Sequence, residues 1–141
     1  MKVLFDTNVI LDVLLDRAPL AEDAAHLLSQ VERAKIAGFA CATTIPAPYS
    51  LLSKALGARA ADRHIHSLPA LFVAAAVNRI VLEGAGAADF DDFEDAVAHE
   101  AAVHAGARYI VTRNVAEFKR AKLPVFTPRE FIGVLASLTA P

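Results

Sequence analysis

Acidic and amide side chains occur where three distant segments of the chain are predicted to meet. Asp6 follows the apolar run of residues 1–5, and Asn114 follows another apolar run. Asp92 and Asp95 open a segment with helical periodicity. Carboxylates without a cysteine cluster or paired histidines favour Mg²⁺ or Mn²⁺ over zinc. An ion held by Asp6 and Asp95 could activate a water and stabilise the transition state of phosphodiester hydrolysis.

Short apolar runs that alternate with helical segments must bring these residues together. Gly38 is expected to end the second helix, and residues 84–86 are expected to break the chain before the acids. Strands separated by helices favour right-handed crossovers. The fold class predicted is α/β, a three-layer α/β/α sandwich with a mainly parallel sheet of about five strands. Ligands of such sheets bind beyond the carboxyl ends of the strands. The predicted strands are 1–5, 38–43, 71–77, 108–112 and 123–127, and the predicted helices are 9–15, 19–36, 48–56, 58–68, 78–83, 92–105 and 128–138.

The composition predicts a single domain over residues 1–141, located in the cytoplasm. Hydrophobic residues make up 55% of the chain, enough for a core. Cys41 is the sole cysteine, which excludes an internal disulfide and a thiolate zinc site. No apolar stretch is long enough to span a membrane. The net charge of −2 includes five acids within residues 89–95, and the rest of the chain has more basic than acidic residues, so an RNA partner remains compatible.

Each of these features also has a simpler interpretation. Acids at a helix start gain from the helix dipole, by about 0.3–1 kcal/mol each, without any ligand. His99 lies one turn after Asp95, and a position on the helix surface is expected for it. Basic residues that follow Asn114 could contact RNA phosphates or could simply form a solvated surface. They are Arg113, Lys119, Arg120 and Lys122.

Four stretches together resemble the PIN-domain family of metal-dependent ribonucleases, which includes the toxins of many bacterial toxin–antitoxin pairs. They are VLFDTNVILDVLL (3–15), ACATTI (40–45), DFDDFEDAVAHEAA (89–102) and AGARYIVTRNVAEF (105–118). The resemblance implies a Mg²⁺- or Mn²⁺-dependent endoribonuclease acting on single-stranded RNA, a small antitoxin partner and a homodimer. It also implies the residue roles. Asp6 and Asp95 would bind the metal, Asp92 and Asn114 would support catalysis, and Asn8 and Thr112 would orient a carboxylate or a bound water.

One departure from the family pattern leaves an alternative open. The family places an acid or polar residue where this chain has Ala47, and its last acid is here Asn114. The chain could therefore be a catalytically impaired PIN-like module that binds RNA or a protein without cutting. A third alternative is a phosphatase resembling the haloacid dehalogenases. That family needs an Asp two residues after the first, where this chain has Asn8.

Overall fold

The computed structural model describes residues 1–43, 53–60, 63 and 71–139. Residues 53–56 and 58–60 are helical, as expected for that part of the chain. Most of the remaining residues of the two helices predicted at 48–56 and 58–68 lie outside the described residues, and so does Ala47.

The centre of the fold is a five-stranded sheet in which every pair of neighbouring strands is parallel. The order across the sheet is β3-β2-β1-β4-β5, so that β1 lies in the middle, flanked by β2 and β4. This arrangement confirms the predicted mainly parallel sheet. The strands are β1 (Lys2–Phe5), β2 (Ala37–Cys41), β3 (Val73–Ala75), β4 (Tyr109–Val111) and β5 (Val125–Phe126).

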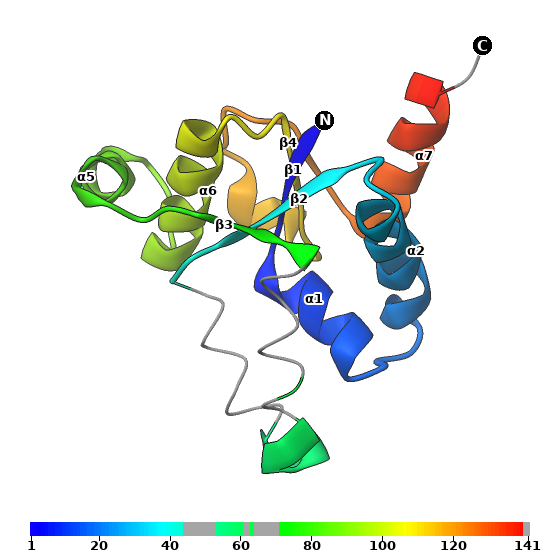
Figure 1. Ribbon diagram of the computed structural model, residues 1–141. Coiled ribbons are helices and arrows are strands. Elements are labelled where there is room, and N and C mark those ends of the chain that lie inside the picture. Colours follow the sequence, from blue (N-terminus) through cyan, green and yellow to red (C-terminus); the bar gives the residue numbers. More distant parts are fainter. Residues whose placement is uncertain (44–52, 61–62, 64–70, 140–141) are drawn as a thin grey trace.

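Helices cover both faces of the sheet (Figure 1). One face carries α1 (Thr7–Leu14), α2 (Leu20–Glu32) and α7 (Pro128–Thr139). The other carries α5 (Arg79–Ala87) and α6 (Phe93–Ala105), and a short 3₁₀ helix, η1 (Val115–Phe118), follows β4. None of the helices in the described part of the chain is long and apolar enough to cross a membrane.

Alternating side chains of β1 divide the core into two clusters. Val3 and Phe5 point to the α1–α2–α7 side, where they pack with residues such as Leu27. Leu4 points to the opposite side, where it packs against α6 through residues such as Val97. A strand buried on both faces reads as a continuous apolar run, which is why residues 1–5 were recognisable as a strand.

Two glycine predictions are wrong, and close packing is the reason. Gly38 lies within β2 instead of ending α2, which stops at Glu32. A Cβ at Gly38 would lie only 2.9 Å from the Phe72 ring. Gly84 lies within α5, and a Cβ there would lie 2.8 Å from Glu100 Oε2 on α6. Both glycines therefore allow close approach between elements and do not act as chain breaks.

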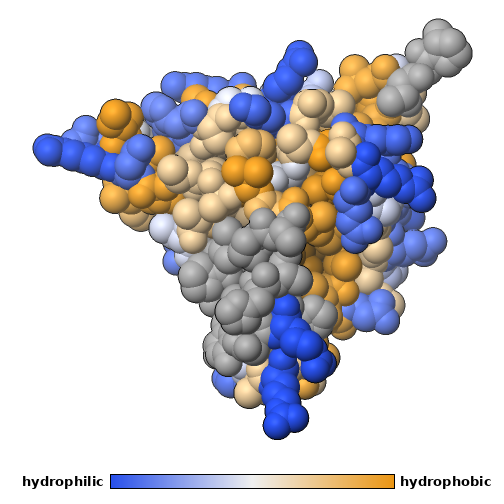
Figure 2. Space-filling view, in the orientation of Figure 1, coloured by the Kyte–Doolittle hydropathy of each residue, from blue (hydrophilic) through white to orange (hydrophobic). Residues whose placement is uncertain are grey.

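Figure 2 shows where polar and apolar residues lie on one face of the molecule. Hydrophilic side chains are prominent over α2 and over part of α5, and apolar residues are also exposed on α5 and near the end of α7. A continuous band of apolar residues lies over α1 and the adjoining part of the sheet.

Candidate functional site

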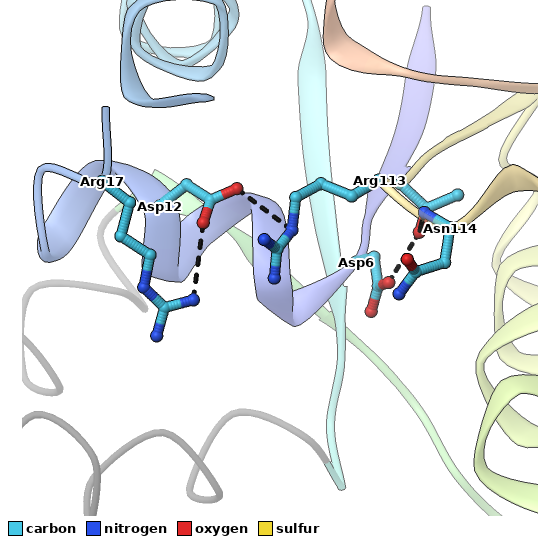
Figure 3. A network of polar contacts seen from close by, with 6 residues as sticks. Asp6, Asp12, Arg17, Arg113 and Asn114 are labelled. Atoms are coloured by element: carbon cyan, nitrogen blue, oxygen red, sulfur yellow. Dashed lines mark hydrogen bonds and ion pairs between the residues drawn. The ribbon is translucent and has the colours of Figure 1, made fainter. Parts of the chain in front are cut away.

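The site begins at the carboxyl ends of the two neighbouring strands β1 and β4. Phe5 pairs with Val111, and the backbone N–H of Asp6 donates to Val111 O at 2.9 Å. This register places Asp6 beside Thr112, whose Oγ1 donates a 2.7 Å hydrogen bond to Asp6 Oδ2 (Figure 3). The sheet therefore fixes the position of the Asp6 carboxylate, and Thr112 fixes its orientation.

The first turn of α6 contributes the second carboxylate. Because α6 leads into β4, it runs opposite to the strands, and its N-terminus lies at their carboxyl edge. Asp92 caps the helix, accepting a 3.1 Å hydrogen bond from the Asp95 N–H. Asp95 is partly buried, and Asp6, Asp92 and Glu117 are all close enough to act on its charge. The convergence of Asp6 and Asp95 predicted from the sequence is present.

Glu117 belongs to the same group of acids, although sequence reasoning did not single it out. It lies in η1, just after the Thr112–Asn114 turn, and its carboxylate is hydrogen-bonded to the Asp95 carboxyl when the two share a proton. A four-residue 3₁₀ helix has no periodicity to detect. The available signal was an acid within one short turn of Asn114.

Burial, together with the crowding of carboxylates, raises the pKa values of Asp6 and Asp95. Burial raises the pKa of Asp6, while hydrogen bonds from Thr112 and the Thr7 backbone oppose that effect. The pKa of Asp95 is raised to about 7, first by burial, then by the hydrogen bond to Glu117 and by the charges of Asp92, Glu117 and Asp6. Like charges held this close are the arrangement expected of a site that binds a cation.

The carboxylate oxygens at this site are suitable ligands for a hard cation, but their positions among the described residues do not yet form a complete set of ligands. When both carboxylates are ionised, Asp95 Oδ2 is buried and has no hydrogen-bond donor in the described part of the chain. Within the same part of the chain, no three Asp, Glu, His or Cys side chains already form a metal-holding group. Glu117 is exposed, so its side chain has room to turn toward an ion. Mg²⁺ keeps several waters, so a few carboxylates are enough to bind it.

Comparison with known proteins agrees with this geometry. The PIN-domain family profile matches residues 2–116. The chain belongs to the PIN-domain family. No curated protein gives a significant match.

Similar solved structures show the same PIN fold at low sequence identity. A chain of VapBC2 from Rickettsia felis, bound to a DNA fragment from its promoter, has a TM-score of 0.67 and 14% identity. The match covers 89% of this chain and 97% of the other. A chain of FitAB bound to the IR36 DNA fragment has a TM-score of 0.64 and 17% identity, covering 89% and 94%. A chain of FitAcB from Neisseria gonorrhoeae has a TM-score of 0.60 and 16% identity, covering 90% and 98%.

The remaining predicted residues of this PIN domain surround the acids less directly. Asn114 is exposed; its N–H donates to Thr112 Oγ1 at 3.1 Å, and its side-chain amide lies beside Asp6 in Figure 3. Asn8 lies in the first turn of α1, two residues after Asp6. Arg113 Nε lies 3.2 Å from the buried Asp12.

The other basic residues lie on the chain that follows η1. Arg120 pairs with Asp89 at 2.7 Å, so its charge is already partly balanced. Lys119 and Lys122 have exposed side chains. A role of these residues in RNA binding stays a prediction.

The surface position expected for His99 is wrong. Its side chain is 2% exposed, stacks on Phe90 and accepts a 3.0 Å hydrogen bond from the Lys122 N–H. Burial lowers its pKa, and the positive charge of Lys122 adds to that effect while Glu100 opposes it. His99 therefore ties α6 to the segment after η1 and does not join the acids.

Proposed function

We propose that this PIN domain is a metal-dependent endoribonuclease that hydrolyses phosphodiester bonds of single-stranded RNA, and that it is the toxin of a toxin–antitoxin pair. The observation that carries the proposal is the convergence of Asp6, Asp95 and Glu117 at one edge of the sheet, with the pKa of Asp95 raised to about 7. This convergence supports a cation site in a family of nucleases. Ala47, the position where the family usually has an acid or a polar residue, lies outside the described residues. Glu117 supplies a third carboxylate.

The chain's own residues have defined parts in this proposal. Asp6 and Asp95 hold the ion, with Glu117 beside them. Thr112 keeps the Asp6 carboxylate oriented through its 2.7 Å hydrogen bond. Asp92 sets the start of α6 and adds negative charge, and Asn114 presents an amide to the same edge. Mg²⁺ or Mn²⁺ bound there would supply activation of a water and charge balance for the phosphodiester transition state.

Partners follow from the same proposal. The similar structures are chains of the VapBC2 and FitAB complexes, which supports a small antitoxin protein as the partner of this chain. We also propose a homodimer, which light scattering of the purified chain would test, and a cytoplasmic location. The neighbouring reading frame is the place to look for the antitoxin, and its product should abolish activity when co-expressed.

A cleavage assay tests the proposal. End-labelled single-stranded RNA is incubated with the chain in Mn²⁺, in Mg²⁺ and in EDTA. We expect cleavage that requires the metal and falls by at least about 100-fold in Asp6→Asn and Asp95→Asn, since each removes a ligand worth several kcal/mol to the transition state. Asp23→Asn is the matched control, because Asp23 pairs with Arg129 on α7, away from the acids.

The same assay separates the proposal from the catalytically impaired module. Cleavage that is equal in wild type and Asp6→Asn contradicts the proposed mechanism. A wild-type chain that binds RNA but neither cuts it nor binds Mn²⁺ at millimolar concentration supports the binding module instead.

A further inference from the structure

Asp12 is a buried acid in the middle of α1, and its two oxygens face two arginines. Its side chain is 1% exposed. Oδ1 lies 3.5 Å from Arg17 Nη1, and Oδ2 lies 3.2 Å from Arg113 Nε (Figure 3). Neither Asp12 Oδ2 nor Arg113 Nε has a hydrogen-bond partner in the described part of the chain, so the ion pair is what balances these two atoms. Burying a carboxylate costs several kcal/mol, and stability alone would be served as well by an apolar residue.

Arg113 is the residue at which the chain leaves the sheet. Up to Thr112 the backbone is held by neighbouring strands, since the Thr112 N–H donates to Phe126 O at 2.9 Å. Beyond it, the Asn114 N–H bonds to Thr112 Oγ1 at 3.1 Å, and the Glu117 N–H bonds to Asn114 O at 3.0 Å. The direction of the turn after Thr112 therefore decides where η1 carries Glu117.

We propose that Asp12 is a positioning residue for the acidic site: its ion pair with Arg113 fixes the turn that places Glu117 against Asp95 and keeps Thr112 on Asp6. The side chain of Asp12 anchors the turn to α1, which begins at the same strand end as Asp6. The inference rests on the proposed function to the extent that these acids hold a metal ion. Its experiment can nevertheless be read without any RNA cleavage.

The positive charge of Arg113 allows a binding experiment to distinguish a positioning role from simple charge repulsion. Arg113 is close enough to Asp6 for its positive charge to lower the pKa of that carboxyl. Charge alone would therefore make Arg113→Gln bind a divalent cation more tightly than wild type, because a repulsive charge is removed. If Arg113 positions the acids, Arg113→Gln should instead bind the divalent cation more weakly than wild type. In this variant Asp12 keeps its contact with Arg17, so folding is preserved.

The first measurement is a calorimetric titration of the purified chain with Mn²⁺. Arg113→Gln and Asp12→Asn should each raise the dissociation constant about tenfold, the equivalent of one lost hydrogen bond. The double variant should bind no more weakly than Arg113→Gln alone, because both act through one contact. Arg17→Gln is the matched control: it removes the other ion pair of Asp12 and should stay within about threefold of wild type.

The second measurement needs no metal. Amide hydrogen exchange at Asn114 and Glu117 should be about tenfold faster in Arg113→Gln and unchanged in Arg17→Gln, since only Arg113 belongs to the turn. Exchange at Ile110, within β4, serves as the internal reference.

The outcomes separate the two proposals. If Arg113→Gln binds Mn²⁺ as tightly as wild type or more tightly, and Asn114 exchanges at the wild-type rate, Asp12 has no positioning role. If wild type binds Mn²⁺ but cuts no RNA, the proposed function fails while the positioning role is still decided by these variants. If wild type binds no Mn²⁺, the exchange rates decide it alone.

Discussion

The hydrogen bond from Thr112 to Asp6 gives the sharpest prediction about this site. Thr112→Val keeps the shape of the buried side chain and removes only the hydroxyl. In the structure this hydroxyl donates to Asp6 Oδ2 at 2.7 Å and accepts the Asn114 N–H at 3.1 Å. Thr112 is fully buried, so water cannot replace either bond without rearrangement.

The magnitude follows from these two contacts. A hydrogen bond to a charged group contributes about 1.5–3 kcal/mol, and a neutral one about 0.5–1.5 kcal/mol. We therefore expect Thr112→Val to lower the free energy of unfolding by about 2–4 kcal/mol at pH 8, measured by urea denaturation. Because the hydroxyl stabilises ionised Asp6, the pKa of Asp6 should rise further in the variant. The difference between the two proteins should accordingly shrink as the pH falls through the pKa of Asp6.

Thr127→Val is the control that distinguishes a general loss of stability, caused by a missing hydroxyl hydrogen bond, from a specific effect on the acidic site. Thr127 Oγ1 accepts the Glu130 N–H at 3.2 Å and caps α7, a contact worth about 1 kcal/mol. Both variants should be less stable than wild type, and only Thr112→Val should also weaken Mn²⁺ binding. Equal stability of Thr112→Val and wild type at pH 8, with equal Mn²⁺ affinity, would refute the reasoning.

Four further predictions concern the acids and α6. In Glu117→Gln the pKa of Asp95 should fall from about 7 toward its ordinary range, because a like charge and a shared proton are lost; carboxyl ¹³C titration by NMR would show this, and an unchanged value would contradict it. In metal-free wild type the raised pKa of Asp95 means that the folded state binds more protons than the unfolded state between about pH 4 and 7. The free energy of unfolding should therefore fall as the pH rises across that window. Asp95→Asn should flatten this pH profile. Asp92→Ala should cost about 1 kcal/mol of stability through the lost cap and leave more cleavage activity than Asp95→Asn; an equal loss in both variants would make Asp92 a ligand. His99→Ala should cost about 3 kcal/mol in urea denaturation because it empties a packed site beside Phe90, and a change below 1 kcal/mol would show that the site collapses freely.

The site residues that directly follow strands were predictable, because the sequence pattern of a buried strand is local. A buried parallel strand appears as an apolar run, and its polar successor must emerge at the carboxyl edge of the sheet. Asp6 and the Thr112–Asn114 turn were found in this way, and the helix carrying Asp95 was found through its helical periodicity. That helix ends at Gly106, which has φ of +81°.

The rest depends on contacts between residues far apart in the chain. Glu117 reaches Asp95 through a turn whose direction no local pattern encodes. In the sequence Asp12 interrupts an apolar run, and its pairing with Arg113 arises only when α1 packs beside the end of β4. His99 is buried because the backbone after η1 covers it, and Gly84 is helical because Glu100 approaches it closely. In each case tertiary packing overrides the local signal.

The most direct test of the central claim is whether the converging acids form one cation site. Free Mn²⁺ is followed by electron paramagnetic resonance while wild type, Glu117→Gln and the double variant Asp6→Asn with Asp95→Asn are titrated. We expect wild type to bind Mn²⁺, Glu117→Gln to bind it at least about tenfold more weakly, and the double variant to show no binding at millimolar Mn²⁺. Wild-type affinity in the double variant would contradict a cation site formed by these acids.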